Sequence, residues 1–286
     1  GFGPLPMTVG AGSRQSTARA SLAIPRTNLQ ILRNTTVTQG TMDRGRALGV
    51  EALLRGRLLR VNANEEVILS AGAINSPQLL MLSGIGDADH LREVGVTPVV
   101  DSAGVGQNLM DHLEVYVQQA CTQPLSLYKD LGLWGRMKIG LRWLFNQSGL
   151  GATNHFEAGG FMRSDLSQPY PNIQFHFLPA AMSYDGTRKV QQHGFQAHVG
   201  PMLPRSRGAV TLFSNNPLQA PRIFFNYMSE AEDWQVFRAA IRAARDIFSQ
   251  PALAAVAGRE LSPGAMEQSD AQLDEFIRSY AESAYH

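Results

Sequence analysis

Residues 66–86 read Glu-Val-Ile-Leu-Ser-Ala-Gly-Ala-Ile-Asn-Ser-Pro-Gln-Leu-Leu-Met-Leu-Ser-Gly-Ile-Gly, and we take the rest of the chain as organised around this stretch. Its apolar run at 67–69 is typical of a short strand buried on both faces. The small residues at 70–73 allow a backbone or a ligand to approach closely. Ser76-Pro77 predicts an N-cap and first position of a helix, and Ser83-Gly84 predicts its end. A strand, a small-residue turn and a helix N-terminus together suit an anionic cofactor.

Composition limits the classes of protein to which the chain can belong. The 286 residues are 44% hydrophobic and 17% charged, which is typical of a globular protein with a sizeable core. The 25 basic residues nearly balance the 24 acidic ones, so nothing indicates a nucleic-acid partner. The single cysteine, Cys121, excludes an intrachain disulfide framework and a Cys-rich metal site. No apolar run is long enough to predict a membrane-spanning helix.

Hydrophobic periodicity predicts a mixed set of strands and helices downstream of the 66–86 stretch. Residues 57–70 read as a strand pair around a turn at 62–64, and 104–112 read as a loop. The alternation at 113–122 predicts a half-exposed strand in an antiparallel sheet. Further strands are expected at 157–162, 172–178 and 209–213.

Three later segments have helical spacing. The best is 229–250, with Ser229 as its expected cap, and 269–284 forms a second, capped at Ser269. The third helix, 133–145, has as core candidates Trp134, Met137, Ile139, Leu141 and Trp143.

Nucleotide-binding glycine motifs are incomplete in this chain. A dinucleotide fingerprint has the form Gly-x-Gly-x-x-Gly after a first strand. Gly10-Ala11-Gly12, Gly84-Ile85-Gly86 and Gly104-Val105-Gly106 each lack the third glycine, so each predicts a turn. No motif in the sequence therefore supports the hypothesis of a nicotinamide-dependent enzyme.

The 66–86 stretch resembles a signature of the GMC (glucose–methanol–choline) flavoprotein oxidoreductases. The resemblance is carried by Gly72-Ala73-Ile74-Asn75-Ser76-Pro77, then Leu79-Leu80 and Ser83-Gly84-Ile85-Gly86. Other segments look like the choline-oxidising branch of this family: 174–179, 198–202, 258–264 and the final Ser283-Ala284-Tyr285-His286. The resemblance implies FAD as cofactor, an alcohol as substrate and hydride transfer from the alcohol to the flavin.

The same resemblance assigns candidate catalytic and substrate-binding residues. His286 matches the family's catalytic base, although a terminal histidine by itself reads as a frayed tail. Glu157 matches a carboxylate that faces a trimethylammonium group, although a lone strand Glu more often lies on the surface. Tyr285 matches an aromatic wall of that site. Phe175 or Phe177 could add another wall, with core packing as the alternative role for either.

Candidate cofactor-binding residues also follow from the resemblance. They are Val37, Ala71, Gly72, Asp111 and His112. Val37 alone reads as an ordinary strand residue, and Asp111-His112 alone reads as a structural turn pair. No metal site is expected, because His176, His193 and His198 lack a ligand-like spacing.

The expected fold is mixed α/β, with a GMC-type FAD-binding part and a substrate domain of antiparallel sheet flanked by helices. We expect a partial FAD-binding domain at 1–112, a substrate domain at 113–228, and at 229–286 the helical start of the C-terminal region. Because the family's first nucleotide motif and the partner of its catalytic base are missing, the chain reads as an internal fragment. The location is expected to be cytoplasmic, with attachment to the surface of the inner membrane left open.

The expected reaction is oxidation of choline to betaine aldehyde, with an electron acceptor that the sequence does not identify. Two alternatives stay open. One is a GMC dehydrogenase for another, neutral alcohol. The other is a truncated chain that neither binds FAD nor turns over.

Overall fold

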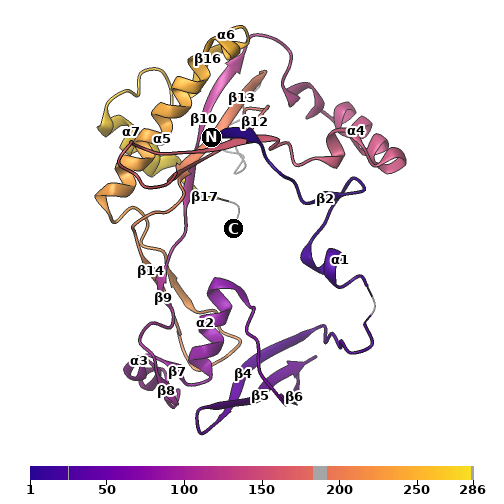
Figure 1. Ribbon diagram of the computed structural model, residues 1–286, viewed down its shortest axis with the longest axis vertical. Coiled ribbons are helices and arrows are strands. Elements are labelled where there is room, and N and C mark those ends of the chain that lie inside the picture. Colours follow the sequence, from indigo (N-terminus) through magenta and orange to yellow (C-terminus); the bar gives the residue numbers. More distant parts are fainter. Residues whose placement is uncertain (25, 183–191, 285–286) are drawn as a thin grey trace. The chain divides into compact units, whose positions relative to one another are not determined.

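The computed structural model describes the whole chain except residues 25, 183–191 and 285–286. Its described part divides into two compact units, which we call unit 1 and unit 2 (Figure 1). Unit 1 comprises residues 1–25, 112–205 and 230–286, and unit 2 comprises 26–111 and 206–229. Each unit thus combines separate segments of the chain, and the division into 1–112, 113–228 and 229–286 stays a prediction.

Unit 1 is built on an antiparallel sheet with the strand order β1-β11-β12-β13-β10-β16, and β17 pairs with β10. This confirms the expected antiparallel sheet. The bounds are β1 Phe2–Pro4, β10 Leu113–Cys121, β11 Ala158–Met162, β12 Ile173–Leu178, β13 Gly194–Pro201, β16 Ala257–Ser262 and β17 Glu282–Ser283. Strand β13, which the sequence analysis missed, is buried along its whole length between β12 and β10.

One face of this sheet is the core of unit 1. Val115, Val199 and Phe175 lie opposite one another across β10, β13 and β12. Phe175 and Phe195 both contact Phe248 of helix α5 (Ala231–Ser249) edge-on. Because side chains alternate across a strand, this arrangement leaves the other face of the same three strands to a polar row.

Two helices cover unit 1, α5 (Ala231–Ser249) and α7 (Asp270–Tyr280) (Figure 1). Ser269 caps α7 in a reciprocal capping box with Gln272, which confirms the predicted cap. The cap of α5 is Glu230 rather than Ser229. Helix α7 ends at Tyr280 instead of continuing to 284, because the chain turns there into β17.

Residues 1–25 add to the far edge of this sheet. β1 pairs with β11, so that Phe2 lies opposite Gly160. A Cβ atom at Gly160 would lie 2.3 Å from the Phe2 ring, so glycine is required for this close approach. The other elements of unit 1 are β2 Val9–Gly10, β3 Ser13–Arg14, α1 Thr17–Ser21, η1 Leu127–Asp130, α4 Leu133–Asn146, η2 Gly149–Ala152 and α6 Pro251–Ala254.

Unit 2 combines short sheets with one main helix, α2 (Gly72–Leu82). Its three-stranded sheet is β4 Thr35–Asp43, β5 Arg46–Leu54 and β6 Arg57–Asn62. The smaller elements are β7 Ile85–Gly86, α3 Ala88–Glu93, β8 Val100–Asp101, β9 Gln107–Leu109, β14 Gly208–Thr211 and β15 Arg222–Phe224. The core cluster is Met81, Leu82, Leu91, Val210 and Leu212.

The strand predicted at 67–69 is wrong. Residues 66–70 have no regular secondary structure, and Ile68 is 75% exposed. No described strand pairs with this segment, so its backbone groups lack the ladder that defines a strand. The expected strand pair over 57–70 is likewise a single strand, β6, which pairs back onto β5.

The predicted start of the following helix is also wrong. Helix α2 begins at Gly72, and Ala71 is its N-cap, so Ser76 and Pro77 lie inside the helix. The Ser76 hydroxyl accepts a hydrogen bond at 3.0 Å from the N–H of Ala71, the residue before the helix, and caps none of the first helical N–H groups. The predicted end is confirmed at Leu82, with Ser83 as C-cap and Gly84 at φ +82°.

Helix α4 forms where predicted, but it does not supply a core. None of its residues is buried, and Trp134, Met137 and Leu141 are exposed. The helical period was correct, yet a period cannot say whether the rest of the described chain covers the apolar stripe. The loop expected at 104–112 is partly wrong as well, because it contains β9, which pairs with β14.

Candidate functional site

The polar face of the unit 1 sheet carries a row of ring-bearing side chains. Tyr116, His198 and His176 lie opposite one another on β10, β13 and β12, and Gly159 of β11 continues the row. The Tyr116 and His198 ring centroids are 4.2 Å apart. The Phe156 ring meets both His176 and His198 edge-on, with centroids 6.0 and 5.1 Å away.

Hydrogen bonds along this face fix the tautomer of the buried His198. The Met182 N–H donates to Gln196 Oε1 at 2.9 Å, so the other end of that amide is the NH₂ group. That NH₂ lies 2.7 Å from His198 Nε2, which must therefore accept. His198 Nδ1 then carries the hydrogen and donates to Glu114 Oε1 at 2.7 Å. The imidazole is held from both sides.

His176 lies beside this network and is held in its neutral form. Burial lowers the pKa of His176 below its usual 6.5, because the charged ring would lose solvation. The nearby His198 and His112 act in the same direction, and Glu114 acts against them. The ring is also held in place, because the Gln174 amide nitrogen lies 3.1 Å from His176 Nε2.

The segment that leads into the predicted catalytic motif lies beside His112. β17 pairs with the start of β10, Ser283 opposite Leu113, and the Ala284 N–H donates to the His112 carbonyl at 3.2 Å. The predicted residues Tyr285 and His286 lie outside the described residues. Glu282, just before them, accepts a hydrogen bond from the Tyr116 hydroxyl at 2.9 Å. The row of the polar face is therefore connected to the C-terminal segment.

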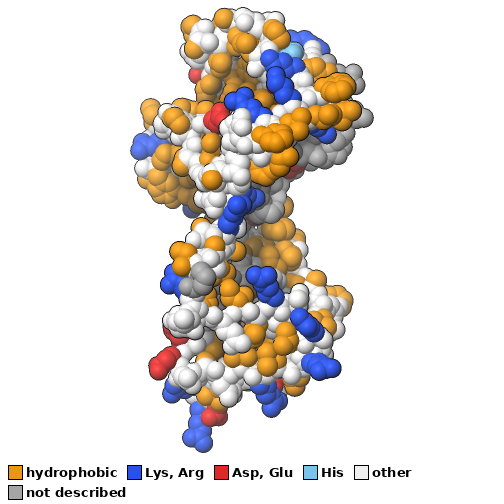
Figure 2. Space-filling model, turned by 90° about the vertical axis from the view of Figure 1, so that its right-hand side faces the viewer, with side chains coloured by type: hydrophobic (Ala, Val, Ile, Leu, Met, Phe, Trp, Pro, Cys, Tyr) orange, Lys and Arg blue, Asp and Glu red, His pale blue; other side chains and the backbone are white. Residues whose placement is uncertain are grey.

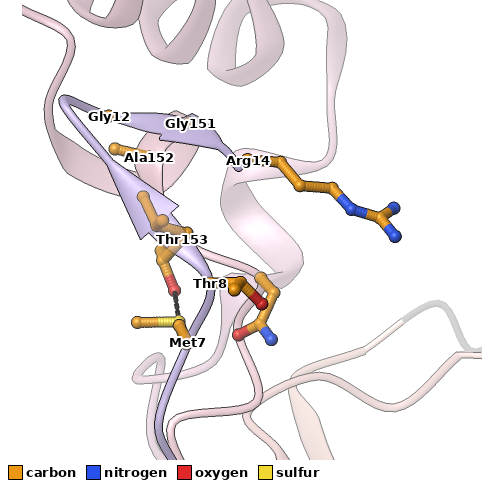
Figure 3. Close-up of a pocket in the computed structure, with 9 residues that line it drawn as sticks. Met7, Thr8, Gly12, Arg14, Gly151, Ala152 and Thr153 are labelled. Carbon is orange, nitrogen blue, oxygen red and sulfur yellow. Dashed lines mark hydrogen bonds between the residues drawn. The ribbon is translucent and has the colours of Figure 1, made fainter. Parts of the chain in front are cut away.

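Glu157 lies one residue before β11 and is exposed. Its Oε1 accepts a hydrogen bond from the Thr153 hydroxyl at 2.8 Å. Thr153 lines a cavity of about 420 Å³ with Met7, Thr8 and Gly12, and its hydroxyl also lies 3.4 Å from Met7 Sδ (Figure 3). Figure 3 shows the Arg14 side chain extending away from the other labelled residues. Glu157 therefore contacts this cavity through Thr153 and does not itself line it.

A second cavity of about 400 Å³ in unit 1 is mainly apolar. Phe156 forms part of its wall together with Leu178, Ile139 and Leu150. Phe156 therefore separates this apolar space from His176 and His198. The sequence analysis did not single out Phe156. Phe175 and Phe177 lie on the opposite, core face, which follows from their alternation with His176.

The predicted cofactor residues, except His112, lie in unit 2. Val37 is half-buried on β4 opposite Ala52. The Asp111 carboxylate accepts a hydrogen bond from the Tyr227 hydroxyl. Ala71 and Gly72 are exposed at the start of α2, which packs on β4, where the Gly40 N–H donates to Ser83 Oγ at 2.7 Å.

The N-terminus of α2 fits the phosphate groups of a dinucleotide. No side chain caps it, and its first turn holds no acidic residue. Gly72 has φ +83°, and a Cβ atom there would meet nothing within 4 Å, so the space in front of this turn is open. Uncapped N–H groups at the positive end of a helix dipole favour an anion.

The spacing of His176, His193 and His198 does not predict a metal centre. In the structure His193 and His198 make hydrogen bonds to other side chains. His193 Nδ1 lies 2.9 Å from the Ser126 hydroxyl, while His198 belongs to the network with Glu114. Across residues 1–24, 26–182 and 192–284, no three His, Cys, Asp or Glu side chains are grouped to hold a metal ion.

Comparison with known families decides which group of proteins this chain joins. Sequence models described as GMC oxidoreductase match residues 1–114 and 204–286. The chain belongs to the GMC oxidoreductase family. These oxidoreductases are flavoproteins that use FAD, which agrees with the fit of the α2 N-terminus. The mixed α/β fold with antiparallel sheets is that of the family.

Relatives within the GMC family carry one recurrent name. An "oxygen-dependent choline dehydrogenase" of Brucella canis is 50% identical over 288 residues, covering 100% of this chain and 52% of the relative. One of Paraburkholderia phymatum is 52% identical over 289 residues, covering 100% and 50%. The chain thus spans about half the length of the curated relatives it matches.

Solved structures of the GMC family superpose closely on the chain. A formate oxidase of Aspergillus oryzae has a TM-score of 0.86 at 25% identity, covering 98% of this chain and 54% of that one. Pyridoxine 4-oxidase from Mesorbium loti has a TM-score of 0.83 at 27% identity, covering 100% and 53%.

Proposed function

We propose that this chain is part of an FAD-dependent enzyme that oxidises choline to betaine aldehyde. The observation that carries the proposal is the 50% identity to oxygen-dependent choline dehydrogenases along the whole chain. Two features of the structure support the proposal, one in each unit. Unit 2 offers an open, uncapped helix N-terminus at Gly72, and unit 1 offers a histidine-bearing sheet face beside Ala284.

Oxidation of an alcohol requires loss of a hydride from carbon and a proton from oxygen. FAD, when bound, supplies the hydride acceptor. The proton is assigned to His286, the residue that the family resemblance identifies as base. His112 would position the segment that carries His286, because its carbonyl binds the Ala284 N–H.

The substrate group that distinguishes choline from other alcohols is its trimethylammonium. This group donates no ordinary hydrogen bond, so a site recognises it with a carboxylate and aromatic faces. Glu157 supplies the carboxylate, and its neighbour Phe156 already contacts the histidine row. Tyr285 is proposed as a further aromatic wall. A neutral alcohol carries no charge for the Glu157 carboxylate to bind. We therefore propose choline, and not a neutral alcohol, as the substrate.

A visible absorption spectrum tests this proposal most directly. The purified chain is incubated with FAD, excess FAD is removed, and choline is then added without oxygen. We expect a retained flavin band that choline bleaches and that its neutral carbon analogue, 3,3-dimethylbutan-1-ol, bleaches poorly. A retained band that the two alcohols bleach equally would contradict choline as the substrate.

Absence of a retained band would have a different meaning. It would overturn the proposal that these 286 residues hold FAD by themselves. The same two-alcohol comparison on a polypeptide of the relatives' full length would then separate cofactor retention from substrate choice.

A further inference from the structure

Strand β17 is the last strand that the structure describes, and it is short. Its two residues, Glu282 and Ser283, pair with the start of β10, and one further backbone bond joins Ala284 to His112. Ala284 is nevertheless only 4% exposed. A strand of two residues shares few backbone hydrogen bonds, so its place depends strongly on side-chain contacts. A side chain that joins β17 to β10 therefore contributes much of what holds this segment.

The register of β17 sets two carboxylates opposite each other. Glu282 is the Cα partner of Glu114. Opposed residues of an antiparallel pair project from the same face, and like charges at such positions destabilise the pairing. Each carboxylate here has its own donor, His198 Nδ1–H for Glu114 at 2.7 Å and the Tyr116 hydroxyl for Glu282 at 2.9 Å. Neither donor is a Lys or Arg, the side chains that Figure 2 shows spread over one face of the molecule. The pairing of β17 with β10 therefore depends on two hydrogen bonds from ring-bearing side chains.

Tyr116 is itself held in place where it reaches Glu282. It lies two residues after Glu114 on β10, so it shares the polar face and is diagonal to Glu282. Its ring lies against His198, with centroids 4.2 Å apart. His198 is fully buried, with a hydrogen bond at each ring nitrogen. The Tyr116 hydroxyl is therefore presented to β17 by a ring that packs on a fixed neighbour.

We propose that Tyr116 is a positioning residue, which through Glu282 sets the path of the chain from β17 toward His286. This role rests on the proposed function, because His286 is assigned as the base of that reaction. It differs from the role of His112, whose backbone carbonyl any residue could supply. The hydroxyl belongs to the Tyr116 side chain alone, so one substitution removes it and keeps the backbone groups that pair β17 with β10.

The alternative is that the hydrogen bond of Tyr116 only adds to the general stability of unit 1. The two roles differ in where the protein loosens when the hydroxyl is removed. Loss of a local anchor raises opening near Ala284 and leaves the core helices unchanged, whereas loss of general stability raises opening throughout unit 1. Leu273 and Ile277 of α7 are buried and report the second case.

Amide hydrogen exchange of the 286-residue chain, followed residue by residue with NMR, tests this role without FAD or choline. We expect Tyr116→Phe to speed exchange of the Ala284 amide at least about tenfold, the effect of losing one hydrogen bond to a charged group, with Leu273 and Ile277 unchanged. Glu282→Ala removes the acceptor and should act alike. Glu282→Gln keeps an acceptor for the Tyr116 hydroxyl, so its exchange should stay within about threefold of that of the unmodified chain.

Tyr170→Phe is the matched control, because it removes a tyrosine hydroxyl from a side chain that is 54% exposed elsewhere in unit 1. It should leave exchange at Ala284 unchanged. Unchanged exchange at Ala284 in both Tyr116→Phe and Glu282→Ala would overturn the positioning role. Equal acceleration at Ala284 and Leu273 would overturn it as well, because the hydroxyl would then serve general stability.

Steady-state kinetics of an FAD-containing polypeptide of the relatives' full length connects the segment to the reaction. Tyr116→Phe should lower kcat for choline at least about tenfold and keep KM within about twofold, because it displaces the base and not the substrate. Glu282→Gln should keep most of kcat. A kcat unchanged by Tyr116→Phe would overturn the positioning of the base. Equal rates with choline and 3,3-dimethylbutan-1-ol would contradict choline as substrate and leave the exchange result standing, so the two proposals fail separately.

Discussion

His198 Nδ1 lies 2.7 Å from Glu114 Oε1, in a part of unit 1 where the two side chains are only 0% and 7% exposed. The residues are 84 positions apart in the chain, on neighbouring strands. Gln196 holds the other nitrogen of the same ring, so the imidazole has one orientation and one tautomer. A rigid imidazole beside His176 keeps the polar face of the sheet organised.

Removal of the Glu114 carboxylate should destabilise unit 1. Glu114→Ala deletes the acceptor of the His198 Nδ1–H in a buried place, which should cost about 2–3 kcal/mol in free energy of unfolding. Glu114→Gln keeps an acceptor and should cost less. Urea unfolding followed by tryptophan fluorescence measures this, because Trp134, Trp143 and Trp234 all belong to unit 1.

An exposed carboxylate in the same unit provides the control for Glu114. Glu275 is 74% exposed, so Glu275→Ala should change the free energy of unfolding by no more than about 0.5 kcal/mol. Equal effects of Glu114→Ala and Glu275→Ala would show that the buried pair contributes nothing particular.

Unit 1 should lose stability as pH falls below 6.5, in part through His176. Burial lowers the pKa of His176, so below 6.5 the unfolded chain takes up a proton that the folded chain refuses. The free energy of unfolding therefore falls with pH, by at most about 1.4 kcal/mol per pH unit for this group. Urea unfolding of His176→Gln between about pH 8 and pH 5 should show a shallower fall.

The comparison at the alkaline end isolates this titration. At about pH 8 the ring is neutral in both folded and unfolded chains, so any difference there reports packing alone. Parallel curves for the two proteins from pH 8 down to pH 5 would refute a lowered pKa at His176.

Glu157→Gln should impair recognition of choline more than chemistry. In a polypeptide that carries this chain and holds FAD, we expect the KM for choline to rise at least about tenfold, because a neutral amide loses the attraction for the trimethylammonium. The KM for 3,3-dimethylbutan-1-ol should change little. Steady-state kinetics with both alcohols measures this, and an unchanged KM for choline would remove Glu157 from the substrate site.

Gly84 should tolerate alanine much less than Gly45, although both have a left-handed backbone. Their φ angles are +82° and +78°, so either substitution carries about 1 kcal/mol of backbone strain. A Cβ atom at Gly84 would also lie 2.6 Å from the Thr97 carbonyl oxygen, whereas one at Gly45 meets nothing within 4 Å. We expect Gly84→Ala to cost at least about 1 kcal/mol more than Gly45→Ala.

Urea unfolding followed by far-UV circular dichroism compares the two variants, with the transition of unit 2 as the readout. Because the two backbone angles are matched, the difference between them reports the collision with Thr97. Similar losses for the two glycine variants would show that the chain near Gly84 relaxes to admit a methyl group.

Short-range signals explain which elements the sequence predicted well. The capping box of Ser269 with Gln272 involves residues three apart, and the end of α2 at Gly84 depends on one φ angle. The apolar period of α5 matches its buried residues for a related reason, because a helix defines its own faces. Such features need no knowledge of what the rest of the chain does.

The sequence-based predictions were wrong where burial of a segment depended on which other part of the chain packs against it. The run at 67–69 looks like a buried strand, yet no described strand pairs with it, and it is exposed. The apolar period of α4 predicts a helix that packs into the core, yet the described chain covers only the side of α4 that carries Ile139 and Trp143. An apolar sequence indicates that burial would be favourable, but only the packing of the folded chain shows whether the segment is buried.

The sequence by itself determined the family, the FAD cofactor and the places of the main helices, because ordered motifs and caps are local. Only the tertiary structure set Tyr116, His198 and His176 in one row and exposed α4 on one side. Strand order and register decide which side chains become neighbours, and pairing between distant segments is not encoded in any short stretch. The polar face of unit 1 therefore exists through long-range pairing, whereas its helices are specified residue by residue.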